Sequence, residues 1–200
     1  MTDRRWNHNT HYHPLALGLA GGARSAVDVG CGEGLLTREL RAAGVGDVTG
    51  LDVDAAQVAT ARSRAGTDDR LRYVVGDALD AVDLPGGRQF DLVTCYATLH
   101  HLDLEAGLSR LRELTAPGGH LVVVGLARDA TPVDAALSLA AVPVAAAADR
   151  LRGHWEHGAP VRDPEQTYGE VRAAARRVLP GVRWRRHLYW RYSLRWRAPA

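Results

Sequence analysis

The sequence contains no lysine, so all 25 of its basic residues are arginine. A P-loop is therefore excluded, because its Gly-Lys-Ser/Thr signature needs a lysine. Cysteine is also scarce: Cys31 and Cys95 lie 64 positions apart, without a redox or metal-binding motif around them. This usage favours a reducing compartment, so we expect a cytoplasmic protein without disulfides.

Long apolar runs are missing as well. The longest stretch, Ala135–Ala148, is interrupted by Ser138 and Pro143, and it falls short of the roughly 20 residues that a membrane span requires. The first residues, Met1–Trp6, include arginines but lead into no apolar segment. We therefore expect neither a secretory signal nor a membrane partner.

The net charge of +2 conceals an asymmetry along the chain. Residues 1–170 carry a net charge of −7, whereas residues 171–200 carry +9 because they hold nine arginines and no acid. Arginines that alternate with aromatic residues can contact phosphates and stack on bases, which leaves an RNA acceptor open as an alternative. Arginines on one face of a terminal strand pair are more often a solvated surface, so our first expectation is that nucleic acid is not a partner.

Strand-like and helix-like segments alternate over the first two thirds of the chain, a pattern typical of a parallel sheet with helices on both faces. Short apolar runs predict five strands, at residues 25–30, 48–53, 71–75, 90–94 and 121–125. Apolar residues at helical spacing predict helices at residues 35–43, 54–65 and 103–114. We therefore expect a doubly wound α/β core.

The alternation of strands and helices ends after the fifth predicted strand. Residues 131–155 are rich in alanine and predict a helix with a kink or break at Pro143, and helical spacing returns over residues 165–178. The end of the chain alternates aromatic or aliphatic residues with arginine, which predicts an antiparallel hairpin. We expect one domain with a mostly parallel seven-stranded sheet, divided into an N-terminal cap (1–20), a core (25–126), a variable lid (127–160) and a closing helix and hairpin (161–200).

Functional residues are expected at the carboxyl ends of the strands, where open α/β sheets bind ligands. The first strand leads into Asp28-x-Gly30-x-Gly32-x-Gly34, where glycines allow a tight turn and a close approach of the backbone to a ligand. A dinucleotide-binding loop needs G-x-G-x-x-G, but here the third glycine comes one place early and Leu35 follows it. The spacing argues against a dehydrogenase.

Two carboxylates follow the next strands. Asp52 comes 18 residues after Gly34, a position from which it can accept hydrogen bonds from both hydroxyls of a ribose. Asp77 follows the third strand in Val74-Val75-Gly76-Asp77-Ala78. Together with the glycine loop, these segments resemble the class I S-adenosylmethionine-dependent methyltransferases, in their short bacterial small-molecule branch, over about residues 25–126.

The resemblance implies a Rossmann-like methyltransferase fold and S-adenosyl-L-methionine as the cofactor. It implies that the glycine loop wraps the methionine part, Asp52 holds the ribose and Asp77 meets the adenine amino group. Residues 6–14 are similar to a cap that covers the cofactor in some bacterial members. The expected cofactor-binding residues are Tyr12, Asp28, Gly30, Gly32, Gly34, Asp52, Val53, Asp77, Ala78 and Cys95, and the expected substrate-binding residues are His13 and Tyr96.

Methyl transfer is an in-line displacement in which the protein chiefly orients the acceptor. A hydroxyl or a protonated amine must lose a proton, and histidine titrates closest to neutrality. His100 and His101, just past the fourth strand, are the candidate catalytic bases, with packing or helix capping as the alternative role for each. Tyr96 and Cys95 at the same strand end can equally serve in packing.

Several absences narrow the acceptor. The spacing of His8, His11 and His13 is a poor match for zinc, and the acidic cluster by which catechol methyltransferases hold magnesium is missing, so we expect no metal. The fourth strand does not end in Asn-Pro-Pro-Tyr, which argues against the amines of bases or glutamine side chains. We expect metal-independent O- or N-methylation of a small organic acceptor, with an RNA methyltransferase or a non-catalytic cofactor-binding module as alternatives.

Overall fold

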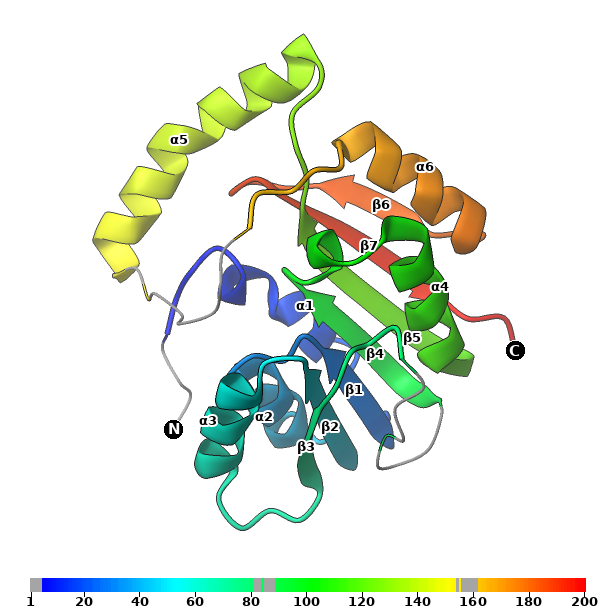
Figure 1. Ribbon diagram of the computed structural model, residues 1–200. Coiled ribbons are helices and arrows are strands. Elements are labelled where there is room, and N and C mark those ends of the chain that lie inside the picture. The colour runs from blue at the N-terminus through cyan, green and yellow to red at the C-terminus, as the bar shows by residue number, and fades with distance from the viewer. Residues whose placement is uncertain (1–4, 81–83, 85–88, 154, 156–161) are drawn as a thin grey trace.

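The computed structural model describes residues 5–80, 84, 89–153, 155 and 162–200. Outside the described residues therefore lie residues 1–4 of the expected cap, 81–83 and 85–88 of the expected core, 154 and 156–160 of the expected lid, and 161 of the expected closing segment. The described part contains a seven-stranded sheet in the order β3-β2-β1-β4-β5-β7-β6 (Figure 1). The strands are β1 (Ser25–Val29), β2 (Asp47–Asp52), β3 (Leu71–Val75), β4 (Phe90–Tyr96), β5 (Thr115–Leu126), β6 (Arg183–Arg186) and β7 (Arg191–Arg197).

Strands β1 to β5 pair in parallel, and β7 runs antiparallel to both β5 and β6. The predicted fold class, a mostly parallel sheet closed by an antiparallel hairpin, is thus confirmed. The helices are η1 (Thr10–Tyr12), α1 (Pro14–Leu17), α2 (Leu35–Ala42), α3 (Ala55–Ala65), η2 (Leu99–His101), α4 (Leu104–Leu114), α5 (Pro132–Arg152) and α6 (Tyr168–Val178).

Side-chain caps decide where several helices begin. Asp54 accepts a hydrogen bond from the backbone N–H of Ala56 (2.8 Å) at the start of α3. Thr131 and Thr167 open α5 and α6 with reciprocal capping boxes. The capping box at Thr167 explains why α6 begins at Tyr168, three residues later than the helical spacing predicts.

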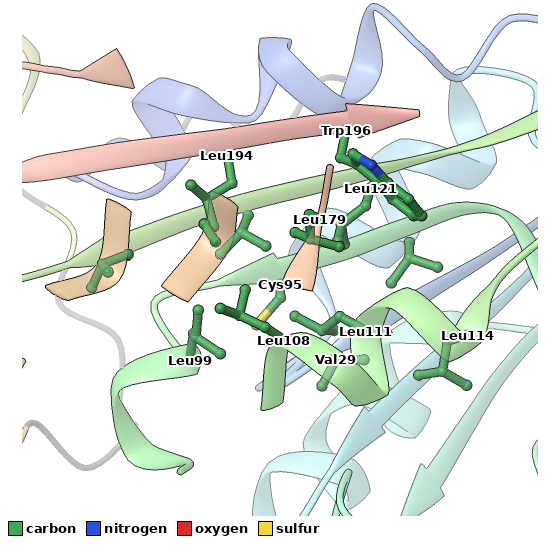
Figure 2. Packing of buried hydrophobic residues seen from close by; sticks show 14 of the residues in the cluster. Val29, Cys95, Leu99, Leu108, Leu111, Leu114, Leu121, Leu179, Leu194 and Trp196 are labelled. Carbon is green, nitrogen blue, oxygen red and sulfur yellow. The ribbon is translucent and has the colours of Figure 1, made fainter. Parts of the chain in front are cut away.

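The core consists of two clusters, one on each face of the sheet. Figure 2 shows the cluster under α4 and α6, where Leu108, Leu111 and Trp196 gather. Along β5, Leu121 and Val123 belong to this cluster, whereas Val122 and Val124 belong to the cluster under α1, α2 and α3. Because both faces are covered, the middle of β5, from Leu121 to Val124, is apolar at every position rather than at alternate ones.

Strand β4 is two residues longer than predicted. Thr94, Cys95 and Tyr96 pair with Val122, Val123 and Val124 of β5, so the last two residues of β4 belong to the ladder rather than to the loop after it. Cys95 and Tyr96 consequently point to opposite faces of the sheet, each into a different core cluster.

Helix α5 continues through Pro143, so the prediction of a break at this residue is wrong. A proline leaves the carbonyl four residues earlier, here that of Leu139, without its helical partner. Leu139 is 74% exposed and Pro143 is also exposed. Water can therefore reach this part of the helix and satisfy the carbonyl, which removes the reason for the helix to end.

Helix α5 stands apart from the sheet and arches past its carboxyl edge (Figure 1). Ala141 and Ala145 are its buried residues, and Val133, Leu137 and Leu151 are at least half exposed. The helix is long enough to cross a membrane, and its most apolar 18-residue window has a mean hydropathy of 1.3, in the range of a membrane span, although only 17% of that window is buried. The apolar stretch in the sequence analysis, Ala135–Ala148, is shorter than the roughly 20 residues of a membrane span, whereas the whole helix is not.

The packing predicts a large effect of Leu194→Ala. Leu194 lies fully buried on β7 in the cluster of Figure 2, so truncation leaves a cavity and lowers the free energy of unfolding by about 2–5 kcal/mol. Leu139→Ala on exposed α5 is the control and changes it by about 0.5 kcal/mol or less. Urea denaturation followed by circular dichroism measures both, and equal effects would contradict the assignment of the core.

Candidate functional site

A cavity of about 410 Å³ lies at the carboxyl ends of β1 to β4. A single pocket of this size is in the range that small-molecule ligands occupy. It brings together residues that the sequence spreads over almost a hundred positions. The predicted site residues that line it are His13, Asp28, Gly30, Gly32, Asp52, Val53, Asp77, Ala78, Tyr96 and His101.

Four predicted site residues do not line this cavity: Tyr12, Gly34, Cys95 and His100. Tyr12 is buried, and its hydroxyl donates to the backbone carbonyl of Leu188 (2.7 Å), which ties the N-terminal cap to the turn between β6 and β7. Cys95 is fully buried and points toward Leu108 and Leu111 of α4 (Figure 2), and burial raises the pKa of its thiol. The surroundings of both side chains favour a packing role.

The three glycines of the loop after β1 all have positive φ angles, of 74°, 53° and 76°. A Cβ on Gly30 would come within 1.9 Å of the Thr98 hydroxyl, and a Cβ on Gly34 within 2.5 Å of the Tyr73 hydroxyl. A Cβ on Gly32 would meet nothing closer than 3.8 Å. Two glycines are thus required by the protein's own packing, whereas Gly32 leaves a bare backbone at the cavity wall.

Strand β2 holds the glycine loop in place. The carbonyl of Leu51 accepts hydrogen bonds from the N–H groups of Gly30 (2.7 Å) and Cys31 (3.0 Å). One carboxylate oxygen of Asp52 accepts from the N–H of Gly32 (2.8 Å), and the other accepts from the N–H of Asp54 (2.9 Å). The carboxylate expected to hold a ribose is therefore fixed at the cavity wall by two backbone donors.

The far side of the cavity combines an apolar surface with a second carboxylate. Val53 lines it with a side chain that is 71% exposed, and Ala78 lines it from the loop after β3. Asp77 lies in the same loop. Its Oδ1 accepts a hydrogen bond from the N–H of Leu79 (2.9 Å), which fixes this carboxylate oxygen. A flat ring can cover the apolar residues while a polar edge meets the carboxylate.

Asp28 is the most deeply buried acid of the site, with 2% of its surface exposed. Its Oδ1 accepts a hydrogen bond from the hydroxyl of Thr94 (2.7 Å). Burial raises the pKa of Asp28 to about 6, against the opposing effects of the Thr94 hydrogen bond and the nearby His13. At neutral pH the carboxylate is mostly ionised, and a cationic ligand in the cavity would compensate its charge.

His13 is oriented by an acid that the sequence analysis missed. Its Nδ1 lies 2.6 Å from Oε2 of Glu39, and its ring meets that of Tyr96 edge to face at 5.4 Å. The Tyr96 hydroxyl in turn donates to the carbonyl of Tyr12 (3.0 Å). Glu39 lies inside α2, 26 residues from His13, and no spacing motif connects two residues that only the fold brings together.

The two histidines after β4 lie in different environments. Their rings lie 4.1 Å apart, but His101 lines the cavity and is exposed, whereas His100 is 8% exposed and does not line it. Burial, followed by the charges of His101 and Arg191, lowers the pKa of His100 to about 4. His101 can therefore meet a ligand in the cavity directly.

Residues that the sequence analysis did not single out complete the wall. Asn7, Asn9 and Thr10 come from the N-terminal cap, and Trp155 follows α5. The side-chain oxygen of Asn7 accepts from the N–H groups of Asn9 and Thr10 (both 2.9 Å), and the N–H of Trp155 donates to the carbonyl of Trp6 (2.8 Å). The resemblance of residues 6–14 to a cap was the signal that could have found the first three.

The N-terminal histidines have separate partners. His8 stacks on Tyr189 with ring centroids 4.8 Å apart, and His11 meets the same ring edge to face at 5.0 Å. His13 instead lies against Glu39. Within the described ranges, no three His, Cys, Asp or Glu side chains are grouped so that they could hold a metal ion.

Comparison with known proteins agrees with this geometry. A methyltransferase domain model matches residues 27–123. Uncharacterised methyltransferases of Mycobacterium bovis and Mycobacterium tuberculosis are 38% identical over 200 residues, which is 98% of this chain and 99% of theirs. A ubiquinone biosynthesis O-methyltransferase of Pseudomonas paraeruginosa is 30% identical over 146 residues, covering 64% of this chain and 60% of its own.

Solved structures share the fold at lower identity. A Pyrococcus horikoshii protein superimposes with a TM-score of 0.69 at 17% identity, over 98% of this chain and 94% of its own. The N-methyltransferase NodS of Bradyrhizobium japonicum, solved with S-adenosylhomocysteine, gives a TM-score of 0.61 at 20% identity, over 96% and 86% of the two chains. The full-length relatives, the domain match and the loop geometry lead to one conclusion: the chain belongs to the class I S-adenosylmethionine-dependent methyltransferases.

Proposed function

We propose that this methyltransferase acts on a small organic acceptor, at an oxygen or a nitrogen, without a metal. The observation that carries the proposal is the partial cover over the cavity: cap residues Asn7, Asn9 and Thr10 and, after α5, Trp155 are among its lining residues. The group that accepts the methyl must therefore reach the cofactor within a pocket of about 410 Å³. A small molecule meets that requirement, whereas a macromolecule would have to insert a single side chain or base.

The residues of the cavity fit the cofactor. When bound, S-adenosylmethionine supplies a methyl group on a positively charged sulfur. Asp28 offers its cationic groups a buried carboxylate, Asp52 offers its ribose two carboxylate oxygens, and Asp77 with the apolar Val53 suits an adenine ring. The bare backbone at Gly32 leaves room for close contact.

We propose His101 as the base that removes the proton of the acceptor. It lies on the wall of the cavity, at the end of η2, just beyond the carboxyl end of β4. Burial and the charge of Arg162 lower its pKa below the usual value for histidine, so the ring is neutral at physiological pH and can accept a proton. His13, held by Glu39, is proposed to contact the bound ligands from the cap.

The strand register argues against RNA as the acceptor. Exposed Arg183 and Arg195 are cross-strand partners, and exposed Arg197 pairs with His120 at the amino-terminal part of β5. The site lies at the other edge of the sheet, where Arg191 pairs with Leu126. Arg197 is six residues from Arg191, or about 20 Å along the strand. The exposed arginines of the hairpin therefore lie mostly at the end of the sheet away from the cavity.

The first prediction from the proposed function concerns Asp52, the carboxylate proposed to hold the ribose. Asp52→Ala removes two hydrogen-bonding oxygens and lowers the affinity for S-adenosylhomocysteine by about 100-fold or more, measured by titration calorimetry. Asp47→Ala, at the other end of β2, removes only a surface pair with Arg72 and leaves the affinity unchanged. Unchanged binding in Asp52→Ala would contradict the assigned role.

The second prediction concerns the pH dependence of cofactor binding. As the pH falls through about 6, Asp28 takes up a proton and loses its charge, so the affinity for S-adenosylmethionine falls. Asp28→Asn binds the cofactor weakly and lacks this dependence. An affinity for the wild type that is constant between pH 5 and pH 8 would exclude the proposed pairing of Asp28 with a cation.

Asp28 also makes the stability of the unliganded protein depend on pH. Its folded pKa of about 6 is higher than its ordinary value of 3.8, so its contribution to stability is complete below about pH 4 and is lost as the pH rises through 6. The loss is roughly 3 kcal/mol. We expect unliganded Asp28→Asn to be at least as stable as the wild type at pH 8, by urea denaturation; a clearly lower stability would contradict the burial of an ionised group.

The third prediction separates catalysis from binding. With an acceptor found by screening hydroxyl and amine compounds, His101→Gln lowers kcat by about 10²–10⁴-fold and leaves the Kd of S-adenosylhomocysteine unchanged. His120→Gln, in β5 opposite Arg197, is the control and keeps full activity. Full turnover by His101→Gln with an unchanged pH profile would rule His101 out as the base.

A further inference from the structure

Arg191 is a buried cation without an acid beside it. Only 8% of its surface is exposed. Its Nε donates to the side-chain oxygen of Asn9 (2.8 Å), and its Nη1 donates to the carbonyl of Tyr189 (2.9 Å). Both acceptors are neutral, and no carboxylate among the described residues forms an ion pair with Arg191. Arg186, only five residues earlier, pairs with Asp129 (3.0 Å) and with Asp134.

An uncompensated charge in the interior is costly, because the loss of hydration is not offset by a counter-ion. Burial lowers the pKa of Arg191 to about 10, so the guanidinium is still charged at neutral pH. Groups that oppose stability in this way are typical of sites whose partner is a ligand rather than the protein itself.

Two further polar groups nearby lack partners. The hydroxyl of Tyr168 and the Nδ1 atom of His100 are buried and have no hydrogen-bond partner in the described structure. The two residues are 4% and 8% exposed. Burial raises the pKa of the Tyr168 phenol, and the charge of Arg186, whose guanidinium lies 3.8 Å from the ring centroid, opposes this effect more than that of Arg191 does. Burial lowers the pKa of His100, and Arg191 contributes to the same effect.

These groups adjoin the cavity of the methyltransferase. Arg191 pairs with Leu126 at the carboxyl end of β5, and the adjacent Tyr192 meets the Tyr168 ring edge to face at 6.4 Å. Asn9, which accepts from Arg191, lines the cavity. His101, whose ring lies 4.1 Å from that of His100, lines it as well. Arg191 and His100 each contact a residue of the cavity wall, Asn9 and His101 respectively, and Tyr168 packs against the residue that follows Arg191.

We infer that Arg191, with Tyr168 and His100, binds a carboxylate group of the methyl acceptor, so that the substrate class is an organic acid carrying the hydroxyl or amine to be methylated. The inference rests on the proposed function. The carboxylate would replace the side-chain oxygen of Asn9 on the guanidinium, and it would accept from the Tyr168 hydroxyl. A charged acceptor in place of a neutral one strengthens the hydrogen bonds of Arg191.

A structural role for Arg191 makes a different prediction. If Arg191 serves only to join Asn9 of the cap to the hairpin, its replacement by an apolar side chain of similar length destabilises the unliganded protein. If it awaits an anion, Arg191→Met removes a buried uncompensated charge, and the unliganded protein gains stability. The change of the melting temperature on Arg191→Met therefore distinguishes the two roles.

The experiment uses the full chain saturated with S-adenosylhomocysteine, and two probes of nearly equal shape, 4-hydroxybenzoate and the neutral 4-hydroxybenzamide. We expect the wild type to bind the carboxylate probe at least about tenfold more tightly by titration calorimetry. Arg191→Met loses this preference, binds S-adenosylhomocysteine normally, and in its unliganded form melts at least about 2 °C higher than the wild type.

Arg195→Met, at an exposed position of the same strand, is the matched control. It removes a solvated charge, so the melting temperature and the preference for the carboxylate probe both stay close to those of the wild type. The inference is overturned if the wild type shows no preference for 4-hydroxybenzoate, if Arg191→Met keeps the preference, or if Arg191→Met melts below the wild type. Because S-adenosylhomocysteine binding is measured in the same samples, its absence would instead count against the cofactor site.

Discussion

The attachment of the glycine loop to strand β2 is the interaction on which the site depends. Backbone N–H groups of Gly30 and Cys31 converge on the carbonyl of Leu51, and the next N–H, that of Gly32, reaches the Asp52 carboxylate. These bonds fix the turn between β1 and α2 and set one side of the cavity. The same carboxylate serves the loop and the proposed ribose contact, so folding of the loop and cofactor binding depend on one side chain.

The site is built from elements far apart in the chain because parallel strands end at a common edge. The cap closes one side of this edge through Asn9, Thr10 and His13, and Tyr12 ties the cap to the hairpin turn at Leu188. The C-terminal hairpin thus does more than complete the sheet. It anchors the cap segment that lines the cavity, and it carries Arg191 to the carboxyl end of β5.

Two buried charges of opposite sign lie at the cavity and behind its wall. Asp28 lies at the end of β1 with a hydroxyl as its hydrogen-bond partner, and Arg191 lies behind Asn9 with two neutral oxygens. Each disfavours the unliganded fold, since charge is removed from water without a counter-ion. A cationic donor at Asp28 and an anionic acceptor at Arg191 would relieve both, which links substrate recognition to stability.

The sequence by itself determined the order of strands and helices, the glycine loop, and the positions of Asp52 and Asp77, because these follow from local periodicity and from short spacings along one segment. Only the tertiary structure decided that His101 and not His100 faces the cavity, that Cys95 turns into the core, and that Glu39 orients His13. It also left Arg191 without an ion pair to any acid of the described residues. Which groups meet across distant segments, and how deeply they are buried, depends on packing that no local pattern encodes.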